Sequence, residues 1–305
     1  MNILFLGGGK RVSMARLFKR AGATKIVSYE GTTHSPISLE GKVIAGRRWS
    51  DPAILEDLTR VCREEEIDVI VPFVDGAVAV AARLSEETGI FSPVSTAEQA
   101  EAMFDKIEAS RIFAEAGIPI PQSYSADSEI EKWIAKPRHG SASKGIEIID
   151  TKDQLDRVLA HAEDFLVQER IDHRDEYTVD CYVSVKTGEP LAIVPRKRIE
   201  VSGGEVVRTE TVIFPEIVDI TRRVLAATGL RGAVTVQFIH DLDANRCLLM
   251  EINPRLGGGV VCSVLAQADI PALILAEAKG ETPRFITYRP YTEIARYPQE
   301  VAFFN

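Results

Sequence analysis

The sequence predicts a mixed fold, with an α/β unit at the N-terminus followed by an α+β region. Two observations predict the first part: short apolar segments alternate with amphipathic ones, and glycine turns separate them, as in a parallel sheet covered by helices. A third observation predicts the second part, because several later apolar runs are joined by short polar turns.

The first 94 residues contain the alternation that predicts the parallel sheet. Apolar runs predict strands, and amphipathic runs bounded by turn residues predict helices. The expected strands are Ile3–Leu6, Thr24–Tyr29 and Asp68–Pro72, and the expected helices are Val12–Arg20 and the segment from Ser50-Asp51-Pro52 to about Glu65.

Gly7–Gly9 follows the first strand and invites comparison with dinucleotide-binding loops. The Gly-x-Gly-x-x-Gly pattern requires glycine where this chain has Val12, which weakens a dehydrogenase interpretation. Two interpretations remain: an anion site at a helix N-terminus carrying Lys10 and Arg11, or a tight turn with solvated basic side chains. Asp75 follows a later strand at its carboxyl end, where ligands of open α/β sheets collect.

Composition excludes several classes of partner and location. The net charge is 36 − 45 = −9, which argues against a nucleic-acid or anionic-membrane surface as the main partner. No run of 18 apolar residues is present, and the opening residues lack the basic segment of a signal peptide, so we expect a buried strand there. Four widely spaced cysteines predict free thiols in a reducing cytoplasm: Cys62, Cys181, Cys247 and Cys262.

A glycine- and serine-rich loop stands between two predicted strands in the middle of the chain. Trp133–Pro137 and Ile146–Ile149 are the strands, and the loop Arg138–Gly145 joins them. Backbone N–H groups and serine hydroxyls suit phosphate oxygens, and Lys136 adds a positive charge. The alternative is an ordinary hairpin loop. The surrounding elements are a capping box at Ser95–Glu98, a helix from Asp105-Lys106 to Gly117, and a strand at Phe165–Ile171.

Pro195–Arg208 predicts a hairpin that turns at Ser202–Gly204. Arg196 and Arg198 are two residues apart and so share one face, which makes a positive patch in an acidic protein. We expect them to contact a substrate or a phosphate. The alternatives are a solvated edge or cross-strand pairing with Glu205 or Glu210. Pro215–Thr228 then predicts an amphipathic helix closed by Gly229.

The most informative segment runs from Glu251 to Gly259. Glu251 and Asn253 point to one face of a predicted strand, and a hairpin centred near Ala244 would place Gln237 beside Glu251. Oxygen ligands on one face suit Mg²⁺, and Arg255 offers a fork of donors to a phosphoryl oxygen. The alternative is an exposed acidic strand end with a Pro-Gly loop.

In their order along the chain, these residues resemble the ATP-grasp ligases, most closely the ATP-grasp unit of the carbamoyl-phosphate synthase large subunit and its short single-unit relatives. The resemblance runs from about Ser95 to Gly280. It implies a Rossmann-like pre-ATP-grasp domain over 1–94, a small lid subdomain over 95–171 that includes the linker helices, and a larger antiparallel-sheet catalytic subdomain with a C-terminal tail over 172–305.

The resemblance also implies a role for each matching residue. ATP would be bound by Lys106, Lys136, the lid residues Gly140, Ser141, Ser143 and Gly145, the adenine-binding strand Gln168, Glu169, Arg170 and Ile171, and the ribose-binding Glu176. Mg²⁺, with Mn²⁺ as the alternative cation, would be held by Gln237, Glu251 and Asn253. Arg255 would stabilise the transferring phosphoryl group, and we count Arg196 and Arg198 with it as candidate catalytic residues. From charge type alone, and not from the resemblance, we expect the acid to be selected by Lys10, Arg11, Asp75, Gly257 and Gly258, together with the Arg196/Arg198 hairpin.

The implied activity is an ADP-forming ligation of a small carboxylate to an amine or similar nucleophile. The chain has one ATP-grasp unit where the full synthase has two, so complete carbamoyl-phosphate synthesis is not expected. The alternative is a nucleotide-binding regulatory protein without turnover. A homodimer is the default expectation for the assembly.

Overall fold

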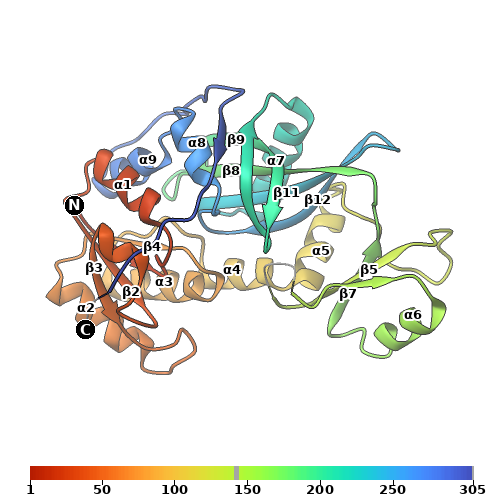
Figure 1. The fold of residues 1–305 in the computed structure, drawn as a ribbon, viewed down its shortest axis with the longest axis horizontal. Helices are drawn as coiled ribbons and strands as arrows, with labels where there is room; N and C mark the ends of the chain where they lie inside the picture. Colours follow the sequence, from red (N-terminus) through yellow and green to blue (C-terminus); the bar gives the residue numbers. More distant parts are fainter. Residues whose placement is uncertain (141–143, 304–305) are drawn as a thin grey trace.

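The computed structural model describes residues 1–140 and 144–303 and contains three sheets. The four-stranded and three-stranded sheets lie at opposite ends of the molecule, and the six-stranded sheet lies between and above them (Figure 1). This combination of a parallel N-terminal sheet with antiparallel sheets confirms the predicted fold class.

The N-terminal sheet is parallel throughout and has the strand order β3-β2-β1-β4. Its strands are β1 (Asn2–Leu6), β2 (Lys25–Glu30), β3 (Lys42–Ala45) and β4 (Val69–Pro72), and its helices are α1 (Val12–Arg20), the 3₁₀ helix η1 (Pro36–Leu39), α2 (Ile54–Glu64) and α3 (Asp75–Thr88). Successive side chains of a strand point to opposite faces. Ile3 and Phe5 therefore pack with α1, while Leu4 and Leu6 pack with α2 and α3.

The small sheet is antiparallel and has the order β6-β5-β7. Two helices, α4 (Ala97–Phe104) and α5 (Lys106–Glu115), lead to it from the N-terminal unit (Figure 1). Its elements are β5 (Trp133–Pro137), β6 (Glu147–Ile149), α6 (Lys152–Leu159) and β7 (Phe165–Glu169). Trp133, Ala135, Ile149, Val158 and Val167 form a separate core beneath α6, which makes this subdomain a compact unit.

The large sheet has the order β12-β11-β8-β9-β10-β13. Its strands are β8 (Arg174–Val183), β9 (Pro190–Ser202), β10 (Glu205–Thr211), β11 (Gly232–Asp241), β12 (Arg246–Asn253) and β13 (Glu293–Ala295), and the helices of this region are α7 (Pro215–Thr228), α8 (Val260–Leu265) and α9 (Ile270–Ala278). Val179 and Cys181 of β8 face α7, whereas Tyr182 faces the core that includes α8 and α9.

The predicted pairing of Gln237 with Glu251 is confirmed, but the turn alone does not produce it. Near the turn, Asp241 pairs with Arg246 and Phe238 with Leu249, a register that would place Met250 opposite Gln237. An irregularity between Gln237 and Phe238 shifts the pairing by one residue and places Glu251 there. A bulge of this kind re-aims a side chain, and here it puts a carboxylate beside an amide.

The N-terminal unit and the C-terminal region share one hydrophobic core. Ile3 and Phe5 of β1 belong to the same cluster as Val260 of α8 and Leu273 of α9. Packing is therefore continuous between these two parts, which are far apart in sequence, and the boundaries at residues 94 and 171 remain predictions.

Two helix starts differ from the sequence prediction by small shifts. The capping box of α4 uses Thr96 and Gln99, one residue after the predicted Ser95 and Glu98. Helix α2 has Ala53 at its N-cap, and Asp51 accepts a hydrogen bond from the Ala53 N–H at 2.9 Å instead of capping the helix itself. Neighbouring hydroxyl and carboxylate residues offer competing caps, so the pattern locates a helix start only to within a residue or two.

The C-terminal tail returns to the body of the same chain. Strand β13 pairs with β10, and the Phe303 ring lies 5.1 Å from the His34 ring of the N-terminal unit (Figure 1). The C-terminal tail therefore packs against other segments of the same chain.

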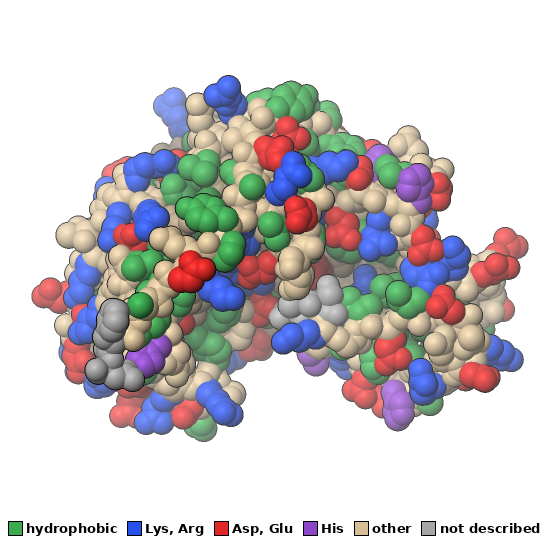
Figure 2. Space-filling model, viewed as in Figure 1, with side chains coloured by type: hydrophobic (Ala, Val, Ile, Leu, Met, Phe, Trp, Pro, Cys, Tyr) green, Lys and Arg blue, Asp and Glu red, His purple; other side chains and the backbone are tan. Residues whose placement is uncertain are grey.

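Acidic and basic side chains are interspersed on the viewed face (Figure 2), and all four cysteines are buried and unpaired. Among the described residues, no helix has the length and apolar character needed to cross a bilayer.

Candidate active site

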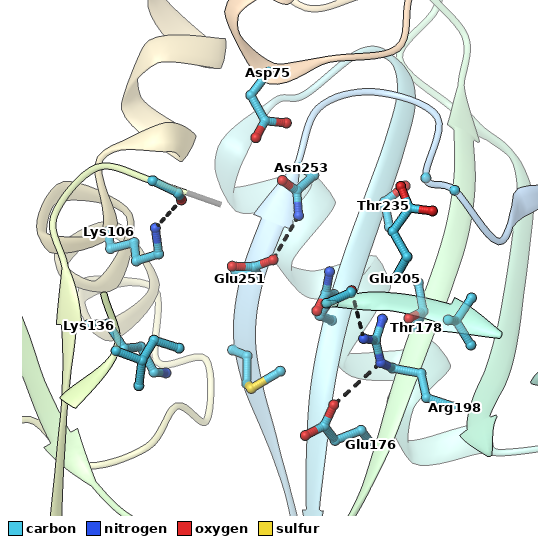
Figure 3. A pocket seen from close by; sticks show the side chains of 18 of the residues that line it. Asp75, Lys106, Lys136, Glu176, Thr178, Arg198, Glu205, Thr235, Glu251 and Asn253 are labelled. Atoms are coloured by element: carbon cyan, nitrogen blue, oxygen red, sulfur yellow. Dashed lines mark hydrogen bonds and ion pairs between the residues drawn. The ribbon is translucent and has the colours of Figure 1, made fainter. Parts of the chain in front are cut away.

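A cleft of about 620 Å³ lies where the three sheets meet. Most of the residues chosen from the sequence line it. They are Arg11, Asp75, Lys106, Lys136, Gly140, Glu169, Arg170, Ile171, Glu176, Arg196, Arg198, Gln237, Glu251, Asn253, Arg255, Gly257 and Gly258. Lys106 and Lys136 lie on one side of the cleft, with Glu251 and Asn253 facing them from the large sheet (Figure 3). Ser141 and Ser143 lie outside the described residues.

Gln237, Glu251 and Asn253 form an oxygen-rich group on neighbouring strands. Gln237 pairs with Glu251 across β11 and β12, and the Asn253 amide donates to Glu251 Oε1 at 3.0 Å. One carboxylate and two amides fit Mg²⁺, which binds few protein oxygens and leaves positions for phosphate and water. With a cation at Glu251, the Asn253 amide would have to rotate so that its oxygen replaces its nitrogen. These three residues would hold the ion.

Two lysines approach the same space from α5 and β5. Lys106 donates to the carbonyl oxygen of Gly140 at 2.7 Å, and Lys136 donates to Gln168 Oε1 at 3.0 Å. Both ammonium groups thus have neutral partners and can accept an anion without breaking an ion pair. Gln168 is buried and does not line the main cleft. Its side chain accepts a hydrogen bond from Lys136 and donates one to the Pro121 carbonyl. The expected contact of Gln168 with ATP is therefore replaced by a contact that positions Lys136.

The protonation of Lys136 predicts how nucleotide binding depends on pH. Burial lowers the pKa of Lys136 to about 8, although the nearby Glu251 carboxylate raises it. A bound phosphate favours the charged lysine, so above about pH 8 binding must take up a proton. We expect Mg·ATP affinity to fall by up to tenfold per pH unit above that value. Calorimetric titrations from pH 7 to 9.5, in buffers of different ionisation enthalpy, measure the Mg·ATP affinity and the number of protons taken up on binding.

Lys136→Met is the control for this pH dependence. The variant should bind Mg·ATP more weakly and with the same affinity at pH 8 and 9.5. A wild-type affinity that is flat across this range would contradict the assignment of Lys136. In the free protein, the pKa of Lys136 in the folded state lies below its unfolded value of about 10.4. The charged lysine therefore lowers the stability of the fold below pH 8, and this cost disappears as the pH rises to about 10.4.

An apolar slot lies beside the lysines and was not predicted from the sequence. Ile134 and Ile146 line it from the small sheet, while Ile171, Ile239 and Met250 line it from the other side. Two apolar walls of this kind suit the faces of a purine. Apolar residues within strands are normally assigned to the core, and only the tertiary arrangement shows that these face a cleft.

The expected adenine-binding strand needs a partial correction. The N–H groups of Glu169 and Arg170 already donate to the carbonyls of Gln122 and Lys132, at 2.8 and 2.9 Å. The Glu169 carboxylate accepts from the Gln122 N–H and from Arg246. These two N–H groups are therefore unavailable to a base. Gly145 does not line the cleft.

Arg196 and Arg198 share a face, as predicted, but their roles differ. Arg196 is 1% exposed and forms a two-point contact with Asp180 at 2.6 and 3.1 Å, with a further bond to Thr209. Its expected contact with substrate therefore requires correction, because the side chain is buried and makes three hydrogen bonds within the protein. Arg198 pairs with Glu176 at 3.3 Å (Figure 3). The alternative pairing with Glu205 or Glu210 is not observed for either arginine among the described contacts.

Thr178 is a cleft residue that the sequence analysis missed. It lies opposite both Gln237 and Arg196 in the sheet, is 2% exposed, and its hydroxyl has no hydrogen-bond partner among the described residues. A buried hydroxyl without a partner is destabilising unless a ligand or water satisfies it. The only sequence signal was its position two residues after Glu176 on one strand.

Thr178→Val is expected to raise the free energy of unfolding by about 1 kcal/mol, since it removes an unsatisfied hydroxyl with little change of shape. The same variant should gain less thermal stability than wild type from Mg·ATP. Thr235→Val is the matched control, because the Thr235 hydroxyl donates to the Arg255 carbonyl at 2.8 Å and its loss should destabilise the protein. Chemical denaturation with and without Mg·ATP measures both effects. Destabilisation of both variants alike would show that the Thr178 hydroxyl is satisfied within the protein.

The N-terminal glycine loop already binds a carboxylate of the protein itself. The Gly9 N–H donates to Glu30 Oε1 at 2.7 Å, and Ser28 donates to the same oxygen at 2.5 Å. Lys10 is exposed and does not line the cleft. The Gly9 N–H is therefore already taken by a carboxylate of the protein, and Lys10 lies outside the cleft. Arg11, one residue later, does reach the cleft.

Arg11, Asp75, Arg255 and Glu205 gather at the end of the cleft next to the N-terminal unit. Arg255 Nε lies 2.5 Å from Asp75 Oδ1, and Arg11 Nη2 lies 3.5 Å from Glu205 Oε1. A Cβ added at Gly258 would lie 2.9 Å from Arg11 Nη1, so glycine allows this close approach. The predicted substrate residues Arg11, Asp75, Gly257 and Gly258 are thus brought together with Arg255.

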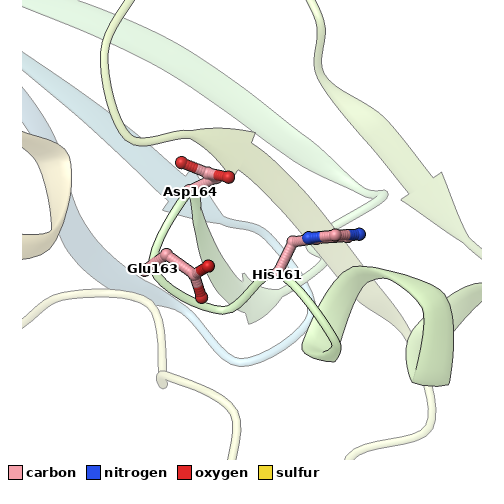
Figure 4. Close-up of side chains that lie close together, drawn as sticks. All are labelled: His161, Glu163 and Asp164. Atoms are coloured by element: carbon pink, nitrogen blue, oxygen red, sulfur yellow. The ribbon is translucent and has the colours of Figure 1, made fainter.

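A second group of metal-ligand type lies on the surface of the small subdomain. It consists of His161, Glu163 and Asp164, all of them exposed (Figure 4). The Asp164 N–H donates to the His161 carbonyl at 3.0 Å, so a simple turn explains why these side chains are close together. Nothing in this group points into the main cleft.

The comparisons with known proteins concern the fold and one family match. Residues 161–299 match a family described as "ATP-grasp in the biosynthetic pathway with Ter operon". N5-carboxyaminoimidazole synthetase from Staphylococcus aureus, solved with ADP, has a TM-score of 0.76 at 16% identity, covering 94% of this chain and 79% of that one. Biotin carboxylase from Campylobacter jejuni, in a β-γ-ATP complex, has a TM-score of 0.74 at 15% identity, with 92% and 71% covered.

A third solved structure has a similar architecture. The biotin carboxylase domain of Hydrogenobacter thermophilus 2-oxoglutarate carboxylase, solved as a dimer with MgADP, ADP and bicarbonate, has a TM-score of 0.75 at 17% identity, and 95% and 72% of the two chains are covered. At these identities the likeness shows the fold, and the family match covers the region that contains β8 to β13. The chain therefore has the fold of these enzymes, and its residues 161–299 match an ATP-grasp family.

Proposed function

We propose that this protein is an ATP- and Mg²⁺-dependent, ADP-forming ligase that activates a carboxylate and joins it to an amine or similar nucleophile. One observation carries the proposal: two lysines with neutral partners, an oxygen-rich group suited to Mg²⁺, and Arg255 converge on one cleft. The similar structures solved with ADP or MgADP support a nucleotide in this position.

The residues of the cleft suit each part of this reaction. A carboxylate oxygen attacks the γ-phosphorus, the bond to the ADP oxygen breaks, and an acyl phosphate forms. The nucleophile then attacks the acyl carbon and phosphate leaves. Lys106 and Lys136 would hold the phosphates, and Arg255 would donate to the oxygens of the transferring group. When bound, Mg²⁺ would neutralise phosphate charge from the side of Glu251.

The finer features of the proposal concern specificity and assembly. We infer a reaction of the carbamoyl-phosphate-synthase type carried out by a single ATP-grasp unit, which would yield an acyl phosphate from a small acid. The H. thermophilus domain is described as a dimer, and a homodimer is proposed here too. Small molecules are the proposed partners.

The first test of this proposal is a thermal-shift titration with Mg·ATP on the wild type and on Glu251→Ala/Asn253→Ala. A ligand at a hundredfold excess over its Kd stabilises by about 2.7 kcal/mol, and we expect the double variant to lose most of this gain. Release of ADP with a panel of carboxylic acids, with hydroxylamine present to trap acyl phosphate as a hydroxamate, then tests turnover.

Each result has a clear meaning. No stabilisation of the wild type by Mg·ATP would overturn the proposal. Stabilisation without ADP release or hydroxamate from any acid would favour a nucleotide-binding regulatory protein.

A further inference from the structure

The two ends of the cleft balance their charges in different ways. At the nucleotide end, Lys106 and Lys136 donate to neutral oxygens, which leaves positive charge for a triphosphate. At the other end, Arg255 faces Asp75 and Arg11 faces Glu205. Each arginine that lines this end therefore already has a carboxylate beside it, and a simple anionic substrate would place a further negative charge next to these carboxylates.

The contacts of Arg255 show what a substrate carboxylate would meet. Its Nε is 2.5 Å from Asp75, whereas its Nη1 and Nη2 make only long contacts of 3.4 Å, with the Leu256 carbonyl and with Asn253 Oδ1. The terminal nitrogens are thus free to bind a carboxylate next to the metal-binding group. That carboxylate would lie beside Asp75, and two carboxylates that share one guanidinium repel each other.

A cation within the substrate, close to its carboxylate, removes this repulsion. Resting on the ligase activity proposed above, we propose that the acid activated in this cleft is an α-amino acid. Its carboxylate binds the terminal nitrogens of Arg255, and its ammonium group binds Asp75. Asp75 side-chain exposure is 25%, so a bond between its carboxylate and an ammonium group is only partly screened by water.

Glu205 is the other carboxylate at this end, and it is less available. It lies 3.5 Å from Arg11 and 3.0 Å from Arg296 of the C-terminal tail, so two guanidiniums already hold it. Asp75 has only Arg255 as an ion-pair partner among the described residues. The difference assigns recognition of the ammonium group to Asp75.

The wall next to Asp75 predicts the side chain of the amino acid. Trp49, Val74 and Gly76 line the cleft there. A Cβ added at Gly76 would lie 3.3 Å from Trp49 Cδ1, so the small residue leaves the indole edge accessible. An apolar side chain would bury area against this wall, whereas a charged one would be desolvated without a partner. The structure therefore favours an apolar amino acid.

The test compares matched acids that differ only in the amino group. L-phenylalanine is compared with 3-phenylpropanoate, and L-leucine with 4-methylpentanoate, by ADP release and hydroxamate formation. In the wild type we expect kcat/KM to be about 10- to 100-fold higher for the amino acid, the range for one hydrogen bond between charged groups. In Asp75→Asn this ratio should fall towards one, and in Glu205→Gln it should persist.

The outcomes separate this inference from the proposed function. Preference of the wild type for the deaminated acids, or a ratio that survives in Asp75→Asn, would overturn the inference while the ligase activity stands. Loss of the ratio in Glu205→Gln alone would overturn the assignment to Asp75. If Asp75→Asn does not fold, N-acetyl-L-phenylalanine with the wild type still tests the need for a cation, because acetylation removes it and should lower kcat/KM at least as much as removal of the amino group does. Absence of Mg·ATP stabilisation would instead count against the proposed function.

Discussion

Arg196→Met is expected to lower the free energy of unfolding by about 3–5 kcal/mol, because it leaves the Asp180 carboxylate buried without its cation. The two side chains are 1% and 2% exposed and are joined at 2.6 Å. Ser263 donates to Asp180 at 2.6 Å but brings no charge to compensate it. Urea denaturation followed by circular dichroism measures the change.

The control for this prediction removes both charges. Arg196→Met combined with Asp180→Leu should be more stable than Arg196→Met alone, since no uncompensated charge remains in the interior. A single variant that loses less than about 1 kcal/mol would show that the pair behaves as an exposed salt bridge. That result would reopen the possibility that Arg196 turns into the cleft to meet a ligand.

The partner of Gln237 was predicted from the sequence and the partner of Arg196 was not, and this difference illustrates what the sequence can predict. Strand and helix positions follow from local periodicity, so the strand Trp133–Pro137 and the helix Pro215–Thr228 were predicted at their observed bounds. The shared face of Arg196 and Arg198 follows from the same periodicity. The ion-pair partner of Arg196 cannot be predicted from this periodicity. Asp180 lies on another strand, and the choice among many acidic residues depends on the complete sheet.

Other features of the site depend on contacts across large sequence separations. Asp75 and Arg255 are 180 positions apart, and Glu30 binds the Gly9 N–H from the adjacent strand. The pairing of Gln237 with Glu251 was predicted, but the bulge that produces it was not, since a one-residue irregularity has no clear mark in the sequence. The sequence thus indicated most of the polar residues that line the cleft, and the structure shows which of them already bind other groups of the protein.

Arg255→Met is expected to lower kcat for ADP release by about 10²–10³-fold, the range for loss of one donor that stabilises charge in a transition state. Arg255 lines the cleft beside Asn253, with Nη2 3.4 Å from the amide oxygen, where the proposed reaction would bring the γ-phosphate and the acid together. The triphosphate would still be held by the lysines. Mg·ATP should therefore stabilise the variant against heat nearly as well as it stabilises the wild type.

Arg255→Lys separates charge from geometry in this prediction. Lysine retains the positive charge but lacks the planar fork, so we expect turnover between those of wild type and Arg255→Met. Steady-state ADP release with the acid identified in the substrate panel, beside thermal shifts with Mg·ATP alone, provides the comparison. Equal turnover in all three proteins would exclude Arg255 from the transfer step. Loss of Mg·ATP stabilisation in Arg255→Met would place the guanidinium in nucleotide binding instead. The group that binds the substrate carboxylate would then have to be sought elsewhere in the cleft.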